Sequence, residues 1–150
     1  MMAQVGQHVL IVDDNVKRRG IIDIVVQRLR RNATLAKDGD EALAVLRPSL
    51  HPLIVIVHAN MRYPDDADPG SLLLALLANQ EFAATHAFVV IVASLASDDL
   101  SALQAAALAV APSASVQWLP LPGTVADITA AVIVAGRYLQ SKASGQPPTP

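Results

Sequence analysis

Cysteine is absent from the 150-residue sequence, and aromatic residues make up only 3% of it. Without cysteine, disulfide bonds, thiolate catalysis and cysteine zinc sites are excluded, which agrees with a reducing compartment. No apolar run reaches the roughly 18 residues of a membrane helix, and residues 1–7 lack the basic and then apolar plan of a signal peptide. We therefore expect a cytoplasmic protein that does not bind a membrane.

Charged residues are also sparse, at 16% of the chain with a formal net charge of −2, whereas 53% of the residues are hydrophobic. This balance excludes disorder over most of the chain and gives no reason to expect a nucleic-acid partner. The basic residues group first as Lys17, Arg18 and Arg19 and then as Arg28, Arg30 and Arg31. Both groups fall in one helical pattern, and we expect them to form its solvated face.

Five short apolar segments alternate with segments of helical period. Strands are expected at residues 9–12, 33–36, 53–57, 88–92 and 116–119. Helices are expected at residues 16–31, from an Asp40 cap to residue 46, at 72–79 after a Ser71 cap, at 98–110 after a Ser97 cap, and from Thr124 onward. The alternation predicts a three-layer α/β protein whose doubly wound, five-stranded parallel sheet has the order 2-1-3-4-5.

Apolar positions within the first and last helical segments indicate which faces are buried. The inward residues expected there are Ile21, Ile22, Val25, Val26 and Leu29, and then Ile128, Val132, Ala135 and Leu139. Residues 142–150 contain three prolines and one glycine. We therefore expect one domain at residues 7–141, followed by a flexible tail or linker.

Ligands of such a sheet bind outside the carboxyl ends of the strands, here between the first and third strands. These ends carry Asp13 and Asp14, then His58, then Ala93 with Ser94, and finally Leu121. A dinucleotide site is disfavoured because Asp13, Asp14 and Asn15 follow the first strand in place of a glycine-rich turn.

The segment Val9-Leu10-Ile11-Val12-Asp13-Asp14-Asn15 resembles the opening of a two-component response-regulator receiver domain. Lys37-Asp38-Gly39-Asp40-Glu41-Ala42-Leu43 resembles the second signature of that family, and the similarity continues through residues 52–61, 89–94 and 118–122. The resemblance covers roughly residues 7–140. It implies the flavodoxin-like receiver fold and a place in two-component signal transduction or a phosphorelay.

Receivers catalyse their own phosphorylation at an aspartate that ends the third strand, using a magnesium ion on the acidic pair and a lysine near the end of the fifth strand. The resemblance places His58 at the acceptor position, Ala93 at a hydroxyl position and Leu121 at the lysine position. Ser94 lies one residue after the hydroxyl position, and a register shift of one residue would turn its side chain to the other face of the sheet. The resemblance therefore implies a degenerate, noncatalytic pseudo-receiver.

Two functions remain open. The first is a module that binds a signalling protein, such as a kinase or output protein, or forms a homodimer through the 98–110 helix, the 116–119 strand and the last helix. The second is a receiver that still accepts a phosphoryl group with Mg²⁺, at Ser94 or a loop aspartate. Trp118 is either the switch aromatic of the family or a core residue, and the alanine-rich 98–110 helix carries either an exposed apolar patch or a buried face.

No cofactor is expected, but a metal ion at the acidic pair is an alternative. Asp13, Asp14 and His58 would suit zinc or another transition metal better than Mg²⁺; otherwise a carboxylate simply hydrogen-bonds His58. Phosphorylation of His58 is a weaker alternative. Asp65, Asp66 and Asp68 lack EF-hand spacing and are expected in a solvated loop, while His8, His51 and His86 are expected to be structural or exposed.

Overall fold

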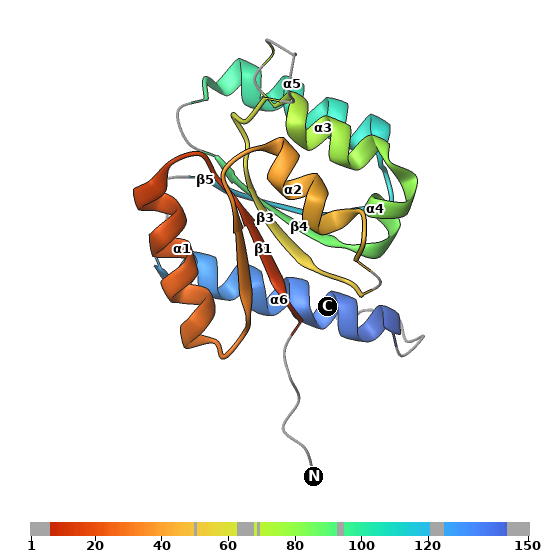
Figure 1. The fold of residues 1–150 in the computed structure, drawn as a ribbon. Coiled ribbons are helices and arrows are strands. Elements are labelled where there is room, and N and C mark those ends of the chain that lie inside the picture. Colours follow the sequence, from red (N-terminus) through yellow and green to blue (C-terminus); the bar gives the residue numbers. More distant parts are fainter. Residues whose placement is uncertain are drawn as a thin grey trace.

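A five-stranded parallel sheet forms the centre of the molecule (Figure 1). The computed structural model describes residues 7–49, 51–62, 68, 70–92, 95–120 and 125–143. Within this part of the chain the strands are β1 (Val9–Val12), β2 (Ala33–Ala36), β3 (Ile54–His58), β4 (Ala87–Val92) and β5 (Ser115–Pro120), in the order β2-β1-β3-β4-β5. The predicted fold class and strand order are confirmed.

Six helices surround the sheet among the described residues. They are α1 (Val16–Arg28), α2 (Gly39–Leu46), α3 (Ser71–Ala78), α4 (Gln80–Thr85), α5 (Ser97–Val110) and α6 (Val125–Ala143). Helices α1 and α6 lie on one face, and α2, α3 and α5 lie on the other (Figure 1). No helix in the described ranges is long and apolar enough to cross a membrane.

The central strands are buried on both faces, as their continuous apolar sequences predict. Every residue of β1, β3 and β4 is buried. Successive side chains point to opposite faces, so Leu10 and Val12 join the core under α2, α3 and α5, while Val9 and Ile11 join the core under α1 and α6. The four inward residues predicted for the last helix are all buried.

Helix α1 ends at Arg28, three residues earlier than predicted. Arg30 adopts a left-handed conformation with φ 58°, and the Arg30 and Arg31 amides donate to the carbonyls of Gln27 and Val26. These two bonds are those of a Schellman motif, which closes a helix at its C-terminus. Ile21, predicted to face the core, is 50% exposed.

Three predicted N-caps are wrong by one or two residues. The cap of α2 is Asp38, whose side chain accepts a hydrogen bond from the Glu41 amide at 2.9 Å, and Asp40 lies inside the helix. Ser71 and Ser97 are the first residues of α3 and α5, which follow Gly70 and Ala96. Gly70 is suited to its position because its φ of 87° is left-handed.

Helix α4 and the end of α6 were not predicted. Helix α4 has only six residues, too few for a helical period to show in the sequence, and Asn79 caps it by accepting from the Phe82 amide. Helix α6 extends to Ala143. Lys142 and Ala143 therefore continue the helix and do not begin the tail, whose remaining residues lie outside the described ranges.

Candidate acidic pocket

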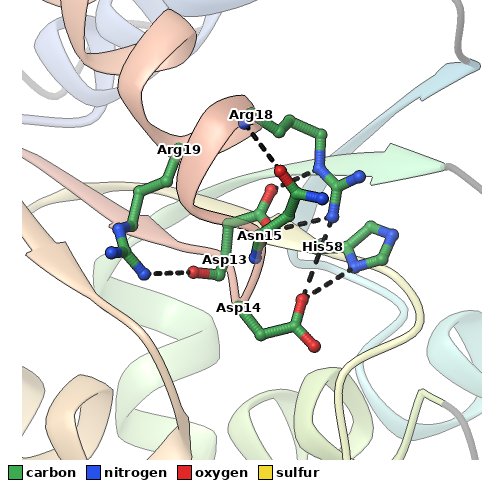
Figure 2. Close-up of polar contacts among 6 residues, drawn as sticks. All are labelled: Asp13, Asp14, Asn15, Arg18, Arg19 and His58. Carbon is green, nitrogen blue, oxygen red and sulfur yellow. Dashed lines mark hydrogen bonds and ion pairs between the residues drawn. The ribbon is translucent and has the colours of Figure 1, made fainter.

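The carboxyl ends of β1 and β3 bring Asp13, Asp14 and His58 together. Val12 pairs in register with Val57, so Asp13, which follows β1, lies beside His58, which ends β3. One ligand atom from each of the three residues lies within 4.8 Å of the others. We call this group, with the arginines described below, the acidic pocket (Figure 2).

Asp13 is almost completely buried, at 1% exposure, and both of its carboxylate oxygens accept hydrogen bonds. Oδ1 accepts from the Asn15 amide at 2.9 Å and from Arg18 Nη2 at 2.7 Å. Oδ2 accepts from Arg18 Nε. The planar guanidinium therefore binds the Asp13 carboxylate in the bidentate geometry that makes arginine–carboxylate pairs strong and directional.

The geometry of the first turn of α1 places Arg18 next to Asp13. Asn15 caps α1 by accepting from the Arg18 amide at 2.9 Å, which sets the first turn beside the end of β1. Helical side chains tilt toward the N-terminus of their helix, so Arg18 extends back over Asp13. Arg19 Nη1 also donates to the Asp13 carbonyl at 2.9 Å.

The prediction that all six basic residues form a solvated face is wrong for Arg18, Arg19 and Arg31. Lys17, Arg28 and Arg30 are exposed as predicted, but Arg18 and Arg19 are half-buried. Arg31 is also half-buried and donates to the Gln7 side chain at 2.7 Å. The sequence signal for Arg18 is an arginine in the first turn of the helix that follows an acidic pair.

Asp14 and His58 make longer contacts in the acidic pocket than Asp13 and Arg18 do. The Asp14 side chain is 66% exposed, whereas the His58 side chain is 7% exposed. His58 Nδ1 lies 3.7 Å from Asp14 Oδ1, and Arg18 Nη2 lies 3.9 Å from the same oxygen. These are ion-pair distances, too long for hydrogen bonds between the named atoms.

Several residues named from the sequence lie outside the described ranges: Ala93, Ser94, Leu121, Asp65 and Asp66. The positions predicted for Ala93, Ser94 and Leu121 at the strand ends, and for Asp65 and Asp66 in a solvated loop, stay predictions. Asp68 is described and is exposed. Trp118 is half-buried on β5 and packs against the core formed with α2, α3 and α5.

The other histidines lie away from the acidic pocket. His86 is buried just before β4, and its Nδ1 accepts a hydrogen bond from the Leu53 amide at 3.0 Å. Burial, and secondarily the charge of Lys142, lower the pKa of His86 to about 4. His8 contacts the Thr34 hydroxyl at 2.6 Å, and His51 is exposed, so the described contacts agree with the structural or exposed roles predicted for all three.

Helix α5 presents an apolar surface to solvent. Its buried residues are Leu103 and Ala107, whereas Leu108 is 65% exposed and Val110 is 46% exposed. Of the two alternatives left open by the sequence, the exposed patch describes this helix better than deep burial does.

Comparison with known proteins points to one fold. No family model matches the sequence, and no curated protein matches it. The receiver domain of Francisella response regulator 1452 aligns with a TM-score of 0.65 and 21% identity, over 86% of this chain and 95% of that one. The signal receiver domain of an HD domain-containing protein from Pseudomonas fluorescens aligns with a TM-score of 0.69 and 16% identity, over 91% and 98%.

A third similar structure is a response regulator from Burkholderia pseudomallei that contains a phosphorylated aspartic acid, a calcium ion and citrate. It aligns with a TM-score of 0.63 and 20% identity, over 92% of this chain and 73% of that one. The chain has the receiver fold. The acidic pocket occupies the strand ends at which this kind of sheet places its ligands.

The acidic pair of this receiver fold does not fit a magnesium ion. Magnesium requires oxygen ligands in a near-octahedral arrangement, and the two oxygens of Asp13 are already bound to Arg18 and the Asn15 amide. The neighbouring His58 offers an imidazole nitrogen, which suits transition metals better than magnesium. The acidic pocket therefore groups residue types that bind cations, but its buried carboxylate, Asp13, is already paired with Arg18.

Proposed function

We propose that this chain is a receiver-like signalling module that does not accept a phosphoryl group at the usual site and acts through contact with another protein. The observation that carries the proposal is the buried imidazole of His58 at the end of β3. The resemblance of the sequence to receivers assigns this position to the acceptor aspartate. In receiver chemistry the nucleophile that attacks phosphorus is a carboxylate oxygen. An imidazole at this position could form only a phosphorus–nitrogen bond, so it does not replace the carboxylate.

The charges of the acidic pocket support the same proposal. Phosphoryl transfer needs positive charge that is directed at the transferring group. Here the guanidinium of Arg18 is directed at the Asp13 carboxylate, 2.7 Å from Oδ1. The charge is therefore balanced within the protein, and the resemblance to receivers places Leu121 where that family uses a lysine.

The surface that we propose for partner binding consists of α5, β5 and α6. Strand β5 is an edge of the sheet, paired with β4 alone among the described strands. Leu108 and Val110 expose apolar side chains on α5, and contiguous exposed apolar patches mark interaction sites. A kinase, an output protein or a second copy of this chain is the partner class that suits such a surface.

The opposing function is phosphoryl acceptance with Mg²⁺ at Ser94 or a loop aspartate. One feature favours it: the Asp14 side chain, beside Asp13, is 66% exposed and open to an incoming ion. The similar Burkholderia response regulator carries a phosphorylated aspartic acid together with a calcium ion, which shows what a receiver fold with its acceptor can hold.

Incubation with acetyl phosphate and MgCl₂, followed by intact-mass measurement, separates the two functions. We expect the mass of the wild-type chain and its Trp118 fluorescence to stay unchanged, while an aspartate-bearing receiver domain treated in parallel gains a phosphoryl group. A stoichiometric adduct on the wild-type chain would overturn the proposal, and peptide mapping would then identify the acceptor.

A further inference from the structure

We infer that the guanidinium of Arg18 is the resident cation of the acidic pocket, occupying the electrostatic place of a divalent ion and excluding one. The inference deepens the proposed function and rests on it, since it explains how an acidic pair persists in a module without phosphoryl transfer. Arg18 belongs to the chain itself, so the charge balance of the acidic pocket does not depend on any metal concentration.

The first argument is that Arg18 and the Asn15 amide already occupy three of the about four lone-pair sites of the Asp13 carboxylate. A carboxylate that binds a metal must offer an oxygen lone pair directed at the ion. Oδ1 of Asp13 already accepts two hydrogen bonds and Oδ2 accepts one from the same guanidinium. Figure 2 shows Arg18 directly against Asp13, with its tip turned toward Asp14 and His58. Because Asp13 is 1% exposed and Arg18 lies against both of its oxygens, we expect a metal ion to bind Asp13 only by displacing Arg18.

The second argument is burial. Asp13 is 1% exposed, and the Arg18 side chain is 21% exposed. A buried carboxylate without a positive partner is strongly disfavoured, and so is a guanidinium withdrawn from its carboxylate without full hydration. Each group therefore holds the other in place.

The third argument is repulsion. Arg18 Nη2 lies 3.9 Å from Asp14 Oδ1, so a divalent ion bound by Asp14 and His58 alone would still lie close to the guanidinium. One positive charge and one doubly positive ion about 4 Å apart in water repel by enough to weaken binding about thirtyfold. The exclusion thus extends to transition metals that His58 would otherwise favour.

The test compares Mn²⁺ binding by the wild-type chain, Arg18→Met and Arg28→Met. Free Mn²⁺ is measured by electron paramagnetic resonance during titration. Arg28 is exposed on the same helix, so Arg28→Met removes the same net charge without opening the acidic pocket. We expect wild type and Arg28→Met to bind Mn²⁺ alike and no tighter than millimolar, and Arg18→Met to bind at least about thirtyfold more tightly.

Thermal unfolding with and without MnCl₂ provides a second measurement on the same variants. Mn²⁺ should raise the unfolding midpoint of Arg18→Met and leave that of wild type unchanged, because a ligand stabilises the folded state only where it binds. Sub-millimolar Mn²⁺ binding by the wild-type chain, or equal binding by wild type and Arg18→Met, would overturn the inference. The wild-type titration still tests the exclusion of Mn²⁺ if Arg18→Met does not fold. Arg18→Lys keeps the repelling charge but lacks the planar group that binds both Asp13 oxygens, so it should bind Mn²⁺ more tightly than wild type by less than about thirtyfold.

Failure of this inference is distinguishable from failure of the proposed function. Mn²⁺ binding by wild type without an acetyl phosphate adduct overturns the role of Arg18 alone. A phosphoryl adduct on the wild-type chain overturns the proposed function. Metal binding by Arg18→Met without an adduct supports both, because His58 still stands in place of the acceptor.

Discussion

Arg18→Met should destabilise the protein more than any other single truncation on the exposed side of α1. The substitution leaves the Asp13 carboxylate, which is 1% exposed, with the Asn15 amide but without its cation. Removing one partner of a buried ion pair costs about 3–5 kcal/mol. Because the guanidinium is 21% exposed and water can partly take its place, we expect a loss near the lower limit, about 3 kcal/mol.

Asp13→Asn should cost less, because the amide oxygen still accepts a hydrogen bond and the partly exposed guanidinium regains water. We expect a loss of about 1–2 kcal/mol. If the two residues act as a pair, the double variant Asp13→Asn/Arg18→Met loses less than the sum of the single losses, with a coupling free energy of about 1–2 kcal/mol.

Urea unfolding at neutral pH, followed by circular dichroism and by the fluorescence of Trp118, the single tryptophan, measures all four forms. In a chain of this size 1 kcal/mol corresponds to about 2–4 °C, so Arg18→Met should lower the melting temperature by about 6–12 °C. Arg28→Met, an exposed control, should stay within about 0.5 kcal/mol of wild type. A loss of less than about 1 kcal/mol for Arg18→Met, or additive losses in the double variant, would refute the pairing argument.

Two further predictions concern stability away from the acidic pocket. The pKa of His86 is about 4 in the folded protein against 6.5 ordinarily, so the unfolded chain binds the proton first. Stability is therefore fully present above pH 6.5 and falls by about 3 kcal/mol as the pH drops toward 4; urea midpoints across this window test it, and His86→Asn, which keeps an acceptor for the Leu53 amide, should flatten the slope. The two glycines Gly20 and Gly70 should respond to alanine with opposite signs. A Cβ on Gly20 meets nothing within 4 Å, whereas one on Gly70 lies 2.8 Å from Leu103 Cδ1 at a φ of +87°, so calorimetry should show a gain of up to about 1 kcal/mol for Gly20→Ala and a loss of about 1–3 kcal/mol for Gly70→Ala.

The sheet could be predicted from the sequence because its signal is strong and local. Continuous apolar runs such as Ile54–Val57 indicate strands buried on both faces, and alternation with helices restricts the topology to a few arrangements. The meeting of Asp13, Asp14 and His58 follows from that topology alone, since the ends of adjacent parallel strands share one edge.

The pairing of Arg18 could not be predicted in the same way. Helical period assigns a residue to a face, but a long arginine side chain can reach about a full turn beyond its Cα position. Arg18 and the exposed Lys17 both lie in the first turn of α1, and which of the two side chains faces Asp13 depends on where the helix starts, which the Asn15 cap sets. Helix caps were predicted less accurately for a related reason, because Asp38 and Asp40 are both good caps and only the backbone conformation selects between them.

The presence of Asp13 and the proposed loss of the acceptor are consistent once Arg18 is included. In a receiver that takes a phosphoryl group, the acidic pair balances a divalent ion, and that ion balances the incoming charge. Without an acceptor there is no phosphoryl charge for the ion to balance, yet a carboxylate as buried as Asp13 still needs a positive partner. Arg18 supplies that partner at 2.7 Å from within the first turn of α1. The acidic pair can then persist as a structural link between β1 and α1, which holds the helix in one position whether or not a metal ion or a phosphoryl donor is present.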